Sequence, residues 1–406
     1  MVRVGVLGGG TAGVEAAQEA AISGAEVTLI ERSEKADLPW EFWPDLIGRP
    51  PRGGAGRARP EDCCYQTLRA TATSVGSRQV TLSTGARHSF DRVILCTGSA
   101  FVPPTLRGVR KSGVHVLDSA EGYACLRDQC ASSENVVVCG EGFRGLAVSE
   151  GLAAPGRIVH IVATRWRHGT PSGPVLDVIK RSARRTGVIL TEGSIAGAFG
   201  SGQVEAAVTN GSAIKCEALI LIPERTPRVI PTDAIQGPEG GALVDGFLRT
   251  TAEGTLAAGG CAEIRNRSGV STVLDEEPGM SGRVAGSNCV GGKTAVGKSR
   301  FLRARAFGLR FATTGLSQDP PSLFGSRFGS VSRSRDSSAC TIVYERLTGR
   351  VSSVQLVEPT EEDSLVYIPS VAGESLHSIA YGGLGSSDIS LLADTARQGL
   401  RVCQRS

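Results

Sequence analysis

Apolar residues along the chain gather in short runs, which are separated by segments rich in glycine or alanine. Two runs near the start, Val4–Leu7 and Val27–Ile30, bracket a segment with helical spacing. Two later runs, Val136–Cys139 and Val159–Ala163, bracket a second segment of the same kind. A strand, a helix and a second strand in this order predict a βαβ unit. The pattern therefore predicts an α/β protein with two such units.

The turn after the first strand has the spacing G-x-G-x-x-G in both units. The first turn reads Gly8-Gly9-Gly10-Thr11-Ala12-Gly13, and the second reads Gly140-Glu141-Gly142-Phe143-Arg144-Gly145. Matching positions differ by 132, as 140 minus 8 and 145 minus 13 show, and Glu31 and Ala163 at the ends of the second strands keep this interval. One such motif is weak evidence, but two in matching frames predict two dinucleotide-binding sites. Two sites of this kind in one chain favour electron transfer between two nucleotides.

Each glycine of the first turn has a separate expected task. Gly8 allows the tight turn, Gly10 lets the backbone approach a pyrophosphate, and Gly13 lets the helix pack closely on the sheet. The helix N-terminus offers free N–H groups to the phosphates. Glu31 lies 21 residues after Gly10, where a carboxylate accepts the ribose hydroxyls of an adenosine. We assign to this site Gly8, Gly10, Thr11, Ala12, Gly13, Glu31 and Arg32.

The second turn lacks the acidic residue, because Ala163 stands where the first unit has Glu31. Arg165 and Arg167 follow at once, and arginines bind a 2′-phosphate that a carboxylate would repel. This favours NADPH over NADH. The alternative is that these charges are only solvated and that either nucleotide binds. We assign to the second site Gly140, Gly142, Phe143, Arg144, Gly145, Arg165 and Arg167.

The remaining patterns suggest a division into three domains. Strands are expected within 79–82, 91–98 and 218–223, and a helix near 279–289. After residue 300 serine and arginine increase, strands alternate at 341–344 and 351–357, and a helix is expected at 389–400. We predict a discontinuous first domain at 1–112 and 231–300, a second at 113–230, and a C-terminal α+β domain at 301–406.

Bulk properties exclude several classes of protein. The formal net charge of +4 is too small for a chain of 406 residues to indicate nucleic-acid binding. No apolar run approaches the ~20 residues that span a bilayer. The first residues already form a strand, so we expect no leader peptide and a cytoplasmic protein. The 11 cysteines are scattered in a way that does not resemble a secreted disulfide framework, and we expect no metal centre.

Together these motifs resemble the FAD-dependent pyridine nucleotide(-disulfide) oxidoreductases, and within them the coenzyme A-disulfide reductase, NADH oxidase and rubredoxin reductase branch. Thr97-Gly98 resembles the family's "ATG" turn, and 256–262 resembles the segment that reaches the flavin ribityl chain. Segments 282–286 and 307–316 resemble a flavin-facing helix and the start of the dimerisation domain. The resemblance implies FAD at the first site, NAD(P)H at the second, hydride transfer between them, and a homodimer. It adds Thr97, Gly98 and Gly260 to the cofactor-binding residues.

The chain departs from the family at the redox cysteine. In the stretch 41–48, Glu41 stands where the coenzyme A-disulfide branch has its cysteine, so a thiol relay from this segment is not expected. Glu41 is a candidate proton donor, and Trp43 with Trp40 and Phe42 is a candidate wall of the flavin or acceptor pocket. The alternative is that these aromatics form a hydrophobic plug between domains.

Further departures concern flavin retention and the substrate. Gly260 replaces the family's ribityl-binding aspartate, which should weaken FAD binding. The arginine-rich loop at 49–59 fits either a clamp for an anionic substrate or partner, or a solvated loop. Cys125 and Cys130 have a spacing that also occurs in redox dithiols, although incidental thiols or a structural disulfide fit as well. Tyr381 and Tyr367 are candidates to reach a partner subunit in a dimer, and the alternative is that both pack within their own domain.

Three functions remain open on these grounds. The leading hypothesis is an FAD-dependent NAD(P)H oxidoreductase that reduces a small molecule, oxygen or a redox protein directly. A disulfide or coenzyme A-disulfide reductase with an atypical cysteine is the second. A flavin- or nucleotide-binding subunit without turnover is the third.

Overall fold

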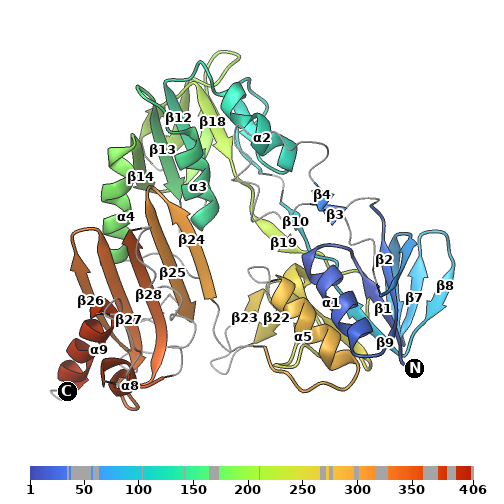
Figure 1. Cartoon of the computed structure of the whole chain (residues 1–406). Coiled ribbons are helices and arrows are strands. Elements are labelled where there is room, and N and C mark those ends of the chain that lie inside the picture. The colour runs from blue at the N-terminus through green and yellow to red at the C-terminus, as the bar shows by residue number, and fades with distance from the viewer. Residues whose placement is uncertain are drawn as a thin grey trace. The chain divides into compact units, whose positions relative to one another are not determined.

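The chain forms two compact units in a computed structural model (Figure 1). The first unit holds the described residues of Met1–Phe42, Pro51–Pro103 and Glu224–Lys298, and the second holds those of Pro104–Pro223 and Ser299–Ser406. The structure describes residues 1–33, 36–37, 56–57, 64–102, 104–140, 142–163, 173–209, 211–265, 271–273, 278–296, 301–315, 328–359, 374–381 and 390–403.

A five-stranded parallel sheet forms the centre of the first unit. Its strand order is β21-β9-β1-β2-β5, so the chain crosses over between neighbouring strands. Such crossovers need helices, and α1 connects β1 to β2 while α5 packs against α1. The elements are β1 (Arg3–Leu7), α1 (Thr11–Ile22), β2 (Glu26–Glu31), β5 (Gln66–Arg69), β9 (Arg92–Leu95), β21 (Thr255–Ala257) and α5 (Pro278–Cys289).

Short strands complete the first unit. The unit also contains two three-stranded sheets, β6-β7-β8 and β20-β22-β23, and two two-stranded sheets, β3-β4 and β10-β19. Their bounds are β3 (Ala36–Asp37), β4 (Gly56–Arg57), β6 (Ala72–Gly76), β7 (Gln79–Leu82), β8 (Arg87–Ser89), β10 (Ser99–Phe101), β19 (Arg225–Pro227), β20 (Ala242–Val244), β22 (Ala262–Arg265) and β23 (Ser271–Val273).

The second unit repeats this plan. Its parallel sheet has the order β11-β18-β12-β13-β14, in which β12 and β13 take the places of β1 and β2. A small antiparallel sheet, β15-β16-β17, follows β14. The elements are β11 (Val114–Val116), α2 (Ala120–Gln129), β12 (Asn135–Cys139), α3 (Gly142–Leu152), β13 (Ile158–Ala163), α4 (Gly173–Arg185), β14 (Val188–Glu192), β15 (Ile195–Phe199), β16 (Ala206–Thr209), β17 (Ala213–Lys215) and β18 (Ala218–Leu221).

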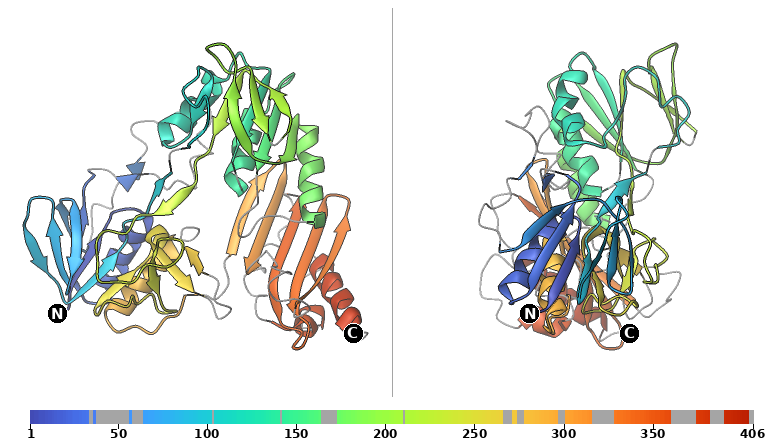
Figure 2. Two further views of the ribbon diagram at one scale, coloured as in Figure 1. Left: turned by 180° about the vertical axis from the view of Figure 1, so that it is seen from behind. Right: turned by 90° about the vertical axis from the view of Figure 1, so that its right-hand side faces the viewer.

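An antiparallel sheet from the C-terminal part belongs to the same unit. Its order is β24-β25-β28-β27-β26, and α8 and α9 lie beside it (Figures 1 and 2). Its other face shares a hydrophobic core with α3, α4 and the parallel sheet. The elements are β24 (Phe301–Ala306), β25 (Leu309–Gly315), β26 (Phe328–Arg335), β27 (Ser338–Glu345), β28 (Val351–Pro359), α8 (Leu376–Tyr381) and α9 (Ser390–Cys403).

One turn fixes the C-terminal sheet to the helices of this unit. Phe307, in the turn between β24 and β25, is buried and has a positive φ of 56°. Its N–H donates to Glu150 Oε1 at 2.6 Å, and its carbonyl oxygen accepts from Ser182 Oγ at 2.7 Å. Because Glu150 lies on α3 and Ser182 on α4, both helices hold the same turn.

The predicted α/β class with two Rossmann-like parallel sheets is confirmed. The helices expected near 279–289 and at 389–400 are α5 and α9. The predicted boundaries of three domains stay a prediction. Within the part of the chain that the structure describes, no helix combines the length and the apolar character needed to cross a bilayer.

A single guanidinium joins the ends of two helices in the second unit. Arg157 Nε donates to the Ser133 carbonyl at 2.8 Å, and Nη2 donates to the Cys130 carbonyl at 2.6 Å at the end of α2. Nη1 donates to the carbonyl of Leu152, the last residue of α3, at 3.0 Å. Carbonyls at helix C-termini lack partners within the helix and carry partial negative charge. Arg157 therefore satisfies the exposed ends of both helices.

Replacing Arg157 with Met should lower the free energy of unfolding of this unit by about 2–4 kcal/mol, because several charge-assisted hydrogen bonds are lost. Replacing Arg127 with Met removes one exposed bond to the Gly151 carbonyl and should cost less than about 1 kcal/mol. Denaturant unfolding with amide exchange at the ends of α2 and α3 measures both. Equal effects of the two variants would contradict the assignment.

Candidate functional site

Two glycines of the first turn are required by the fold itself. Gly8 has a φ of +104°, and its N–H donates to the Ile30 carbonyl at 2.9 Å. A Cβ at Gly13 would lie 1.8 Å from the Gly8 carbonyl oxygen. Because no side chain fits there, α1 begins directly at the end of β1.

Gly10 has no such requirement. Its φ of −72° and ψ of −176° suit any residue, and a Cβ added there would meet nothing within 4 Å. It is the N-cap of α1 and provides no side-chain hydrogen bond, so the first N–H groups of α1 receive no side-chain cap. Open space before uncapped N–H groups is what a bound phosphate needs. The geometry therefore fits a pyrophosphate at Gly10.

Glu31 lies beside this turn. Its carboxylate accepts from the Gly9 N–H and, at 2.7 Å, from the Ser33 N–H. A carboxylate offers about four lone-pair sites, so about two remain for ribose hydroxyls. Thr11 is the first residue of α1, and the exposed Arg32 follows Glu31. The sequence predicted Glu31 at this position, but not its hydrogen bonds to the backbone N–H groups of Gly9 and Ser33.

A second helix meets α1 through small residues. A Cβ at Gly282 would lie 2.2 Å from the Ala12 carbonyl oxygen, and one at Gly286 would lie 2.5 Å from the Ala16 carbonyl oxygen. Both contacts advance in the same direction along the two helices, so α1 and α5 run parallel. Their N-termini, with positive dipole ends, therefore lie at the same end of the first unit.

Side chains fix this arrangement in the N-terminal half of α5. Ser281 Oγ accepts from the Gly259 N–H at 3.0 Å and donates to the Pro278 carbonyl at 2.9 Å. Arg283 Nη1 forms an ion pair with Glu15 Oε2 at 2.9 Å. Sequence reasoning did not identify these contacts, although the spacing of Gly282 and Gly286 was a signal for close helix packing.

The residues that the resemblance assigned to the flavin lie in the same unit. The Thr97 hydroxyl donates to the Arg228 carbonyl, and the Arg228 N–H donates to the Gly98 carbonyl at 2.9 Å. Gly260 is buried in the 3-10 turn Gly259–Cys261, which follows β21. Gly260 supplies no carboxylate at this position. The first unit therefore fits the pyrophosphate of FAD at the glycine turn, but it lacks an acidic partner for the flavin at Gly260.

The second turn has the same frame with different details. A Cβ at Gly145 would lie 2.7 Å from the Gly140 carbonyl oxygen, which matches the Gly13 contact in the first unit. Gly142 has a positive φ of 64° and is the first residue of α3. In the first unit the equivalent residue, Gly10, is the N-cap, and α1 begins one residue later, at Thr11. Phe143 and Arg144 follow in the first turn of α3.

The strand end of the second site carries no acid at Ala163, which is buried. Its neighbour in register on β14 is Glu192, whose carboxylate lies 3.5 Å from Lys180 Nζ. Glu192 therefore lies one strand further from the turn than Glu31 does in the first unit. Arg165 and Arg167 lie outside the described residues, as do Glu41 and Trp43.

Most described thiols are unsuited to redox chemistry. Burial raises the pKa of Cys96 and of Cys261, and it raises the pKa of Cys130 to about 11 and that of Cys289 to about 12. A thiol with so high a pKa holds almost no thiolate near neutral pH. Cys125 is exposed and Cys130 is buried, and both are free. Neither the redox dithiol nor the structural disulfide that their spacing left open is formed in this structure.

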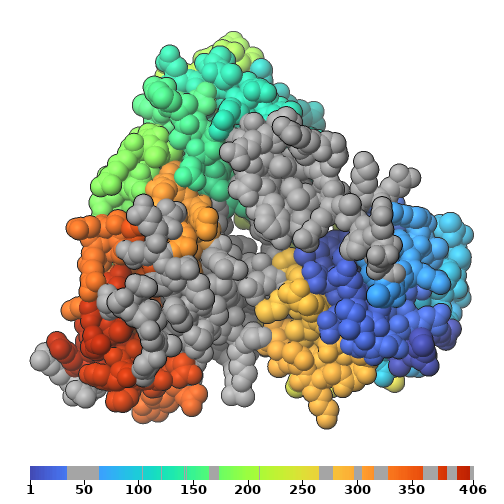
Figure 3. All heavy atoms as spheres, viewed as in Figure 1, coloured from blue at the N-terminus to red at the C-terminus, as the bar shows by residue number. Residues whose placement is uncertain are grey.

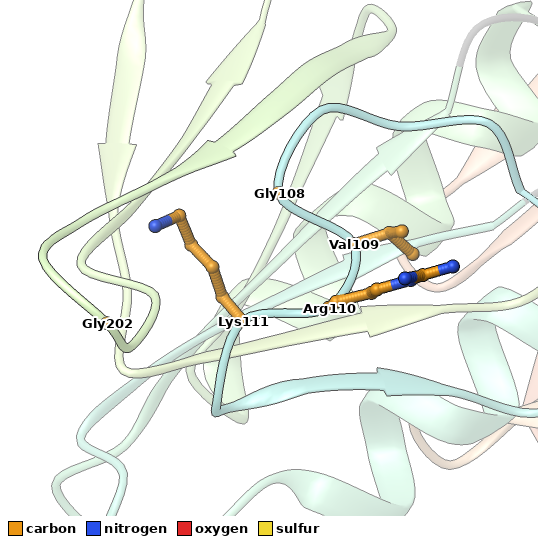
Figure 4. Close-up of a pocket in the computed structure, with 5 residues that line it drawn as sticks. All are labelled: Gly108, Val109, Arg110, Lys111 and Gly202. Atoms are coloured by element: carbon orange, nitrogen blue, oxygen red, sulfur yellow. The ribbon is translucent and has the colours of Figure 1, made fainter.

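A pocket of about 400 Å³ lies in the second unit, and none of the residues assigned above is among those that line it (Figure 4). It is lined by Gly108, Val109, Arg110, Lys111 and Gly202. Lys111 extends toward the loop of Gly202, and its Nζ donates to the Gly200 carbonyl at 2.6 Å, whereas Arg110 points away (Figure 4). Its one inward cation is already engaged, so we assign it no ligand.

The contrast between Gly10 and Gly13 gives a test of the first site. Replacing Gly13 with Ala should destabilise the first unit by at least about 2 kcal/mol, because the methyl group collides with backbone. Replacing Gly10 with Ala should leave stability nearly unchanged and weaken FAD binding by at least about tenfold. Thermal unfolding without flavin and a fluorescence titration with FAD measure the two effects. Unchanged FAD affinity in the Gly10 variant would show that the pyrophosphate does not bind at this turn.

Comparisons with known proteins agree with this geometry. The family model described as "Pyridine nucleotide-disulphide oxidoreductase" matches residues 2–276. A rubredoxin-NAD(+) reductase of Pseudomonas putida is 29% identical over 198 residues, which are 47% of this chain and 51% of the relative. An NADH dehydrogenase-like protein of Mycobacterium tuberculosis is 32% identical over 197 residues, 44% of this chain and 48% of the relative. The chain thus spans about half the length of these relatives.

Solved structures extend the likeness over the whole chain. An NAD-dependent persulfide reductase from A. fulgidus has a TM-score of 0.83 at 20% identity, covering 99% of this chain and 84% of the other. A water-forming NADH oxidase from Lactobacillus brevis has a TM-score of 0.80 at 18% identity, covering 100% and 99%. These show a shared fold. Because the family model covers well over half of the sequence, the chain belongs to the pyridine nucleotide-disulphide oxidoreductase family.

Proposed function

We propose that this chain is an FAD-dependent NAD(P)H oxidoreductase. The observation that carries the proposal is the repeated plan of the two parallel sheets. In both sheets the glycine turn follows the strand that is third in the sheet order, β1 in one and β12 in the other. In both turns the last glycine of the motif lies against the carbonyl oxygen of the first, Gly13 against Gly8 and Gly145 against Gly140. Two dinucleotides bound this way fit hydride transfer from NAD(P)H to FAD, followed by delivery of two electrons to an acceptor.

The residues have distinct parts in this proposal. Gly10 leaves room for the FAD pyrophosphate, the N-termini of α1 and α5 stabilise negative charge, and Glu31 accepts from the ribose. Gly140, Gly142 and Gly145 form the corresponding turn for NAD(P)H. Thr97 and Gly98 fix the path of the chain out of β9 through their bonds to Arg228.

The acceptor is reduced directly in this proposal, without a thiol relay. Glu41 replaces the cysteine of the coenzyme A-disulfide branch, and the buried described thiols have raised pKa values. A rubredoxin reductase among the relatives and an NADH oxidase among the structural neighbours support a redox protein or oxygen as the acceptor. Glu41 and Trp43 stay candidates for the proton donor and for the wall of the acceptor pocket.

Finer features are part of the same proposal. NADPH is favoured because position 163 is alanine and arginines follow it, although Glu192 beside it would suit a free ribose. A homodimer through the C-terminal sheet and a cytoplasmic location complete it. Each rests on sequence patterns and on the family.

Anaerobic titration of the flavin-loaded protein tests the function. We expect the visible flavin absorbance to bleach with NADPH, at lower concentration than with NADH, because Ala163 leaves no carboxylate against a 2′-phosphate. The number of thiols that react without denaturant should be the same before and after reduction. Reoxidation by oxygen, a quinone and rubredoxin then ranks the acceptors.

Two outcomes would contradict this reading. Flavin absorbance that bleaches with neither nucleotide would leave a binding subunit without turnover. A gain of two reactive thiols on reduction would instead establish the disulfide reductase alternative with an atypical cysteine.

Restoring the missing carboxylate should improve flavin retention. We expect Gly260→Asp to tighten FAD binding by ~10- to 100-fold, the effect of one charge-assisted hydrogen bond. Gly246→Asp is the control, because it adds the same charge at an exposed glycine of the same unit, where a Cβ would meet nothing within 4 Å. FAD titration of the flavin-free proteins measures both, and equal affinities for the two variants would show that Gly260 does not face the flavin.

A further inference from the structure

An ion pair joins α4 to the last strand in the order of the parallel sheet of the second unit. Lys180 Nζ on α4 lies 3.5 Å from Oε1 of Glu192, which is the final residue of β14. The side chain of Lys180 is 28% exposed and that of Glu192 is 70% exposed. Figures 1 and 2 show α4 beside β14, and atoms of α4 reach the surface in Figure 3. The carboxylate of Glu192 is therefore accessible to a ligand.

This pair lies beside the strand end at which the second site is expected to hold a ribose. Ala163 ends β13 and is in register with Glu192 on the parallel strand β14. The Gly193 N–H donates to the Ala163 carbonyl at 2.9 Å, which continues the pairing past Glu192. Neighbouring strands are about 4.8 Å apart. Glu192 is therefore one strand spacing away from the position that is equivalent to Glu31 of the first unit.

The side chain of Glu192 projects from the face of the sheet that α4 covers. Residues in register on neighbouring parallel strands point to the same face. Ala163 is buried in the hydrophobic core that includes Ile179 of α4. Glu192 points to the same side, where Lys180 meets it.

The two units differ in where they place the acid at the strand ends. In the first unit Glu31 ends β2, and its neighbour in register is Arg69 on β5. In the second unit Ala163 and Glu192 hold these two places. A carboxylate at the first place binds a free ribose and disfavours a 2′-phosphate. Glu192 repels a 2′-phosphate in the same way from one strand further out, unless a cation offsets its charge.

We propose that the Lys180–Glu192 ion pair sets the preference of the second site between NADPH and NADH. Lys180 offsets the charge of Glu192, so that a 2′-phosphate can lie beside Ala163. This rests on the proposed function, in which the second site holds NAD(P)H. The Debye length is about 8 Å at physiological salt, so charges one strand away from the phosphate are only partly screened.

The stability of the fold does not account for the pair. An exposed ion pair contributes little to the free energy of unfolding. The helix α4 is already held against the sheet by Val175, Val178 and Ile179, which are buried in the shared core. Variants of Lys180 and Glu192 should therefore fold normally, and their effects on ligand binding can be compared directly.

Calorimetric titration of the flavin-loaded protein tests the proposal with adenosine 2′,5′-bisphosphate and 5′-AMP, which differ only in the 2′-phosphate. Neither ligand carries a nicotinamide, so no redox step contributes to the affinities. Lys180→Gln should lower the preference for the bisphosphate by about threefold, and Glu192→Gln should raise it by about threefold. The double variant loses one charge of each sign, and its preference should be close to that of the wild type.

A second ion pair of the same unit provides the control. Lys215 Nζ lies 3.9 Å from Glu217 Oε1. Glu217 accepts from the N–H of Asn135, the first residue of β12, so this pair lies at the end of β12 away from the glycine turn. Lys215→Gln should leave the preference unchanged.

Three outcomes would overturn the proposal. An unchanged preference in Lys180→Gln, with both ligands still bound, would overturn it and leave the second site in place. A change of the same sign in both single variants would also overturn it, because opposite charges must act in opposite directions. Binding of neither ligand by the wild type would overturn it together with the second site. All other charges are the same in every variant, so the differences report this pair alone.

Discussion

The close contact between two glycines in each nucleotide-binding turn determines where the following helix begins. In each turn the fifth residue after a glycine presses against that glycine's carbonyl oxygen, Gly13 on Gly8 and Gly145 on Gly140. A helix can begin there only if neither position carries a side chain. Its first N–H groups then point past the end of the strand, where a phosphate can lie. In the first unit the same kind of contact continues into α5 through Gly282 and Gly286.

Sequence patterns predicted the parts of the fold whose causes are local. Short apolar runs between glycines were sufficient to identify β1, β2, β12 and β13, and helical spacing identified α5 and α9. The parallel packing of α5 on α1 was not predicted, since it joins segments about 270 residues apart. Arg157 was missed for the same reason, because its role depends on where two helices end in space. Side-chain networks of this kind have no periodic signature.

The candidate site divides in the same way. Glycine spacing predicted both turns and the position of Glu31, because those residues are adjacent in one βαβ unit. It could not predict that Glu31 accepts from the Gly9 N–H, or that Glu192 lies in register with Ala163. These depend on the turn conformation and on which strand follows β13 in the sheet. The inert character of Cys96 and Cys261 likewise follows from burial, which residue spacing does not reveal.

The shared core beneath the turn at Phe307 has a practical consequence. Phe307, Leu309 and Phe311 bury apolar surface against the same cluster as Val175 and Ile179 of α4. A fragment that stops before residue 300 would leave that apolar face of α4 in water, even though every strand of its parallel sheet is present. The nucleotide-binding part of the second unit is therefore a poor candidate for expression alone.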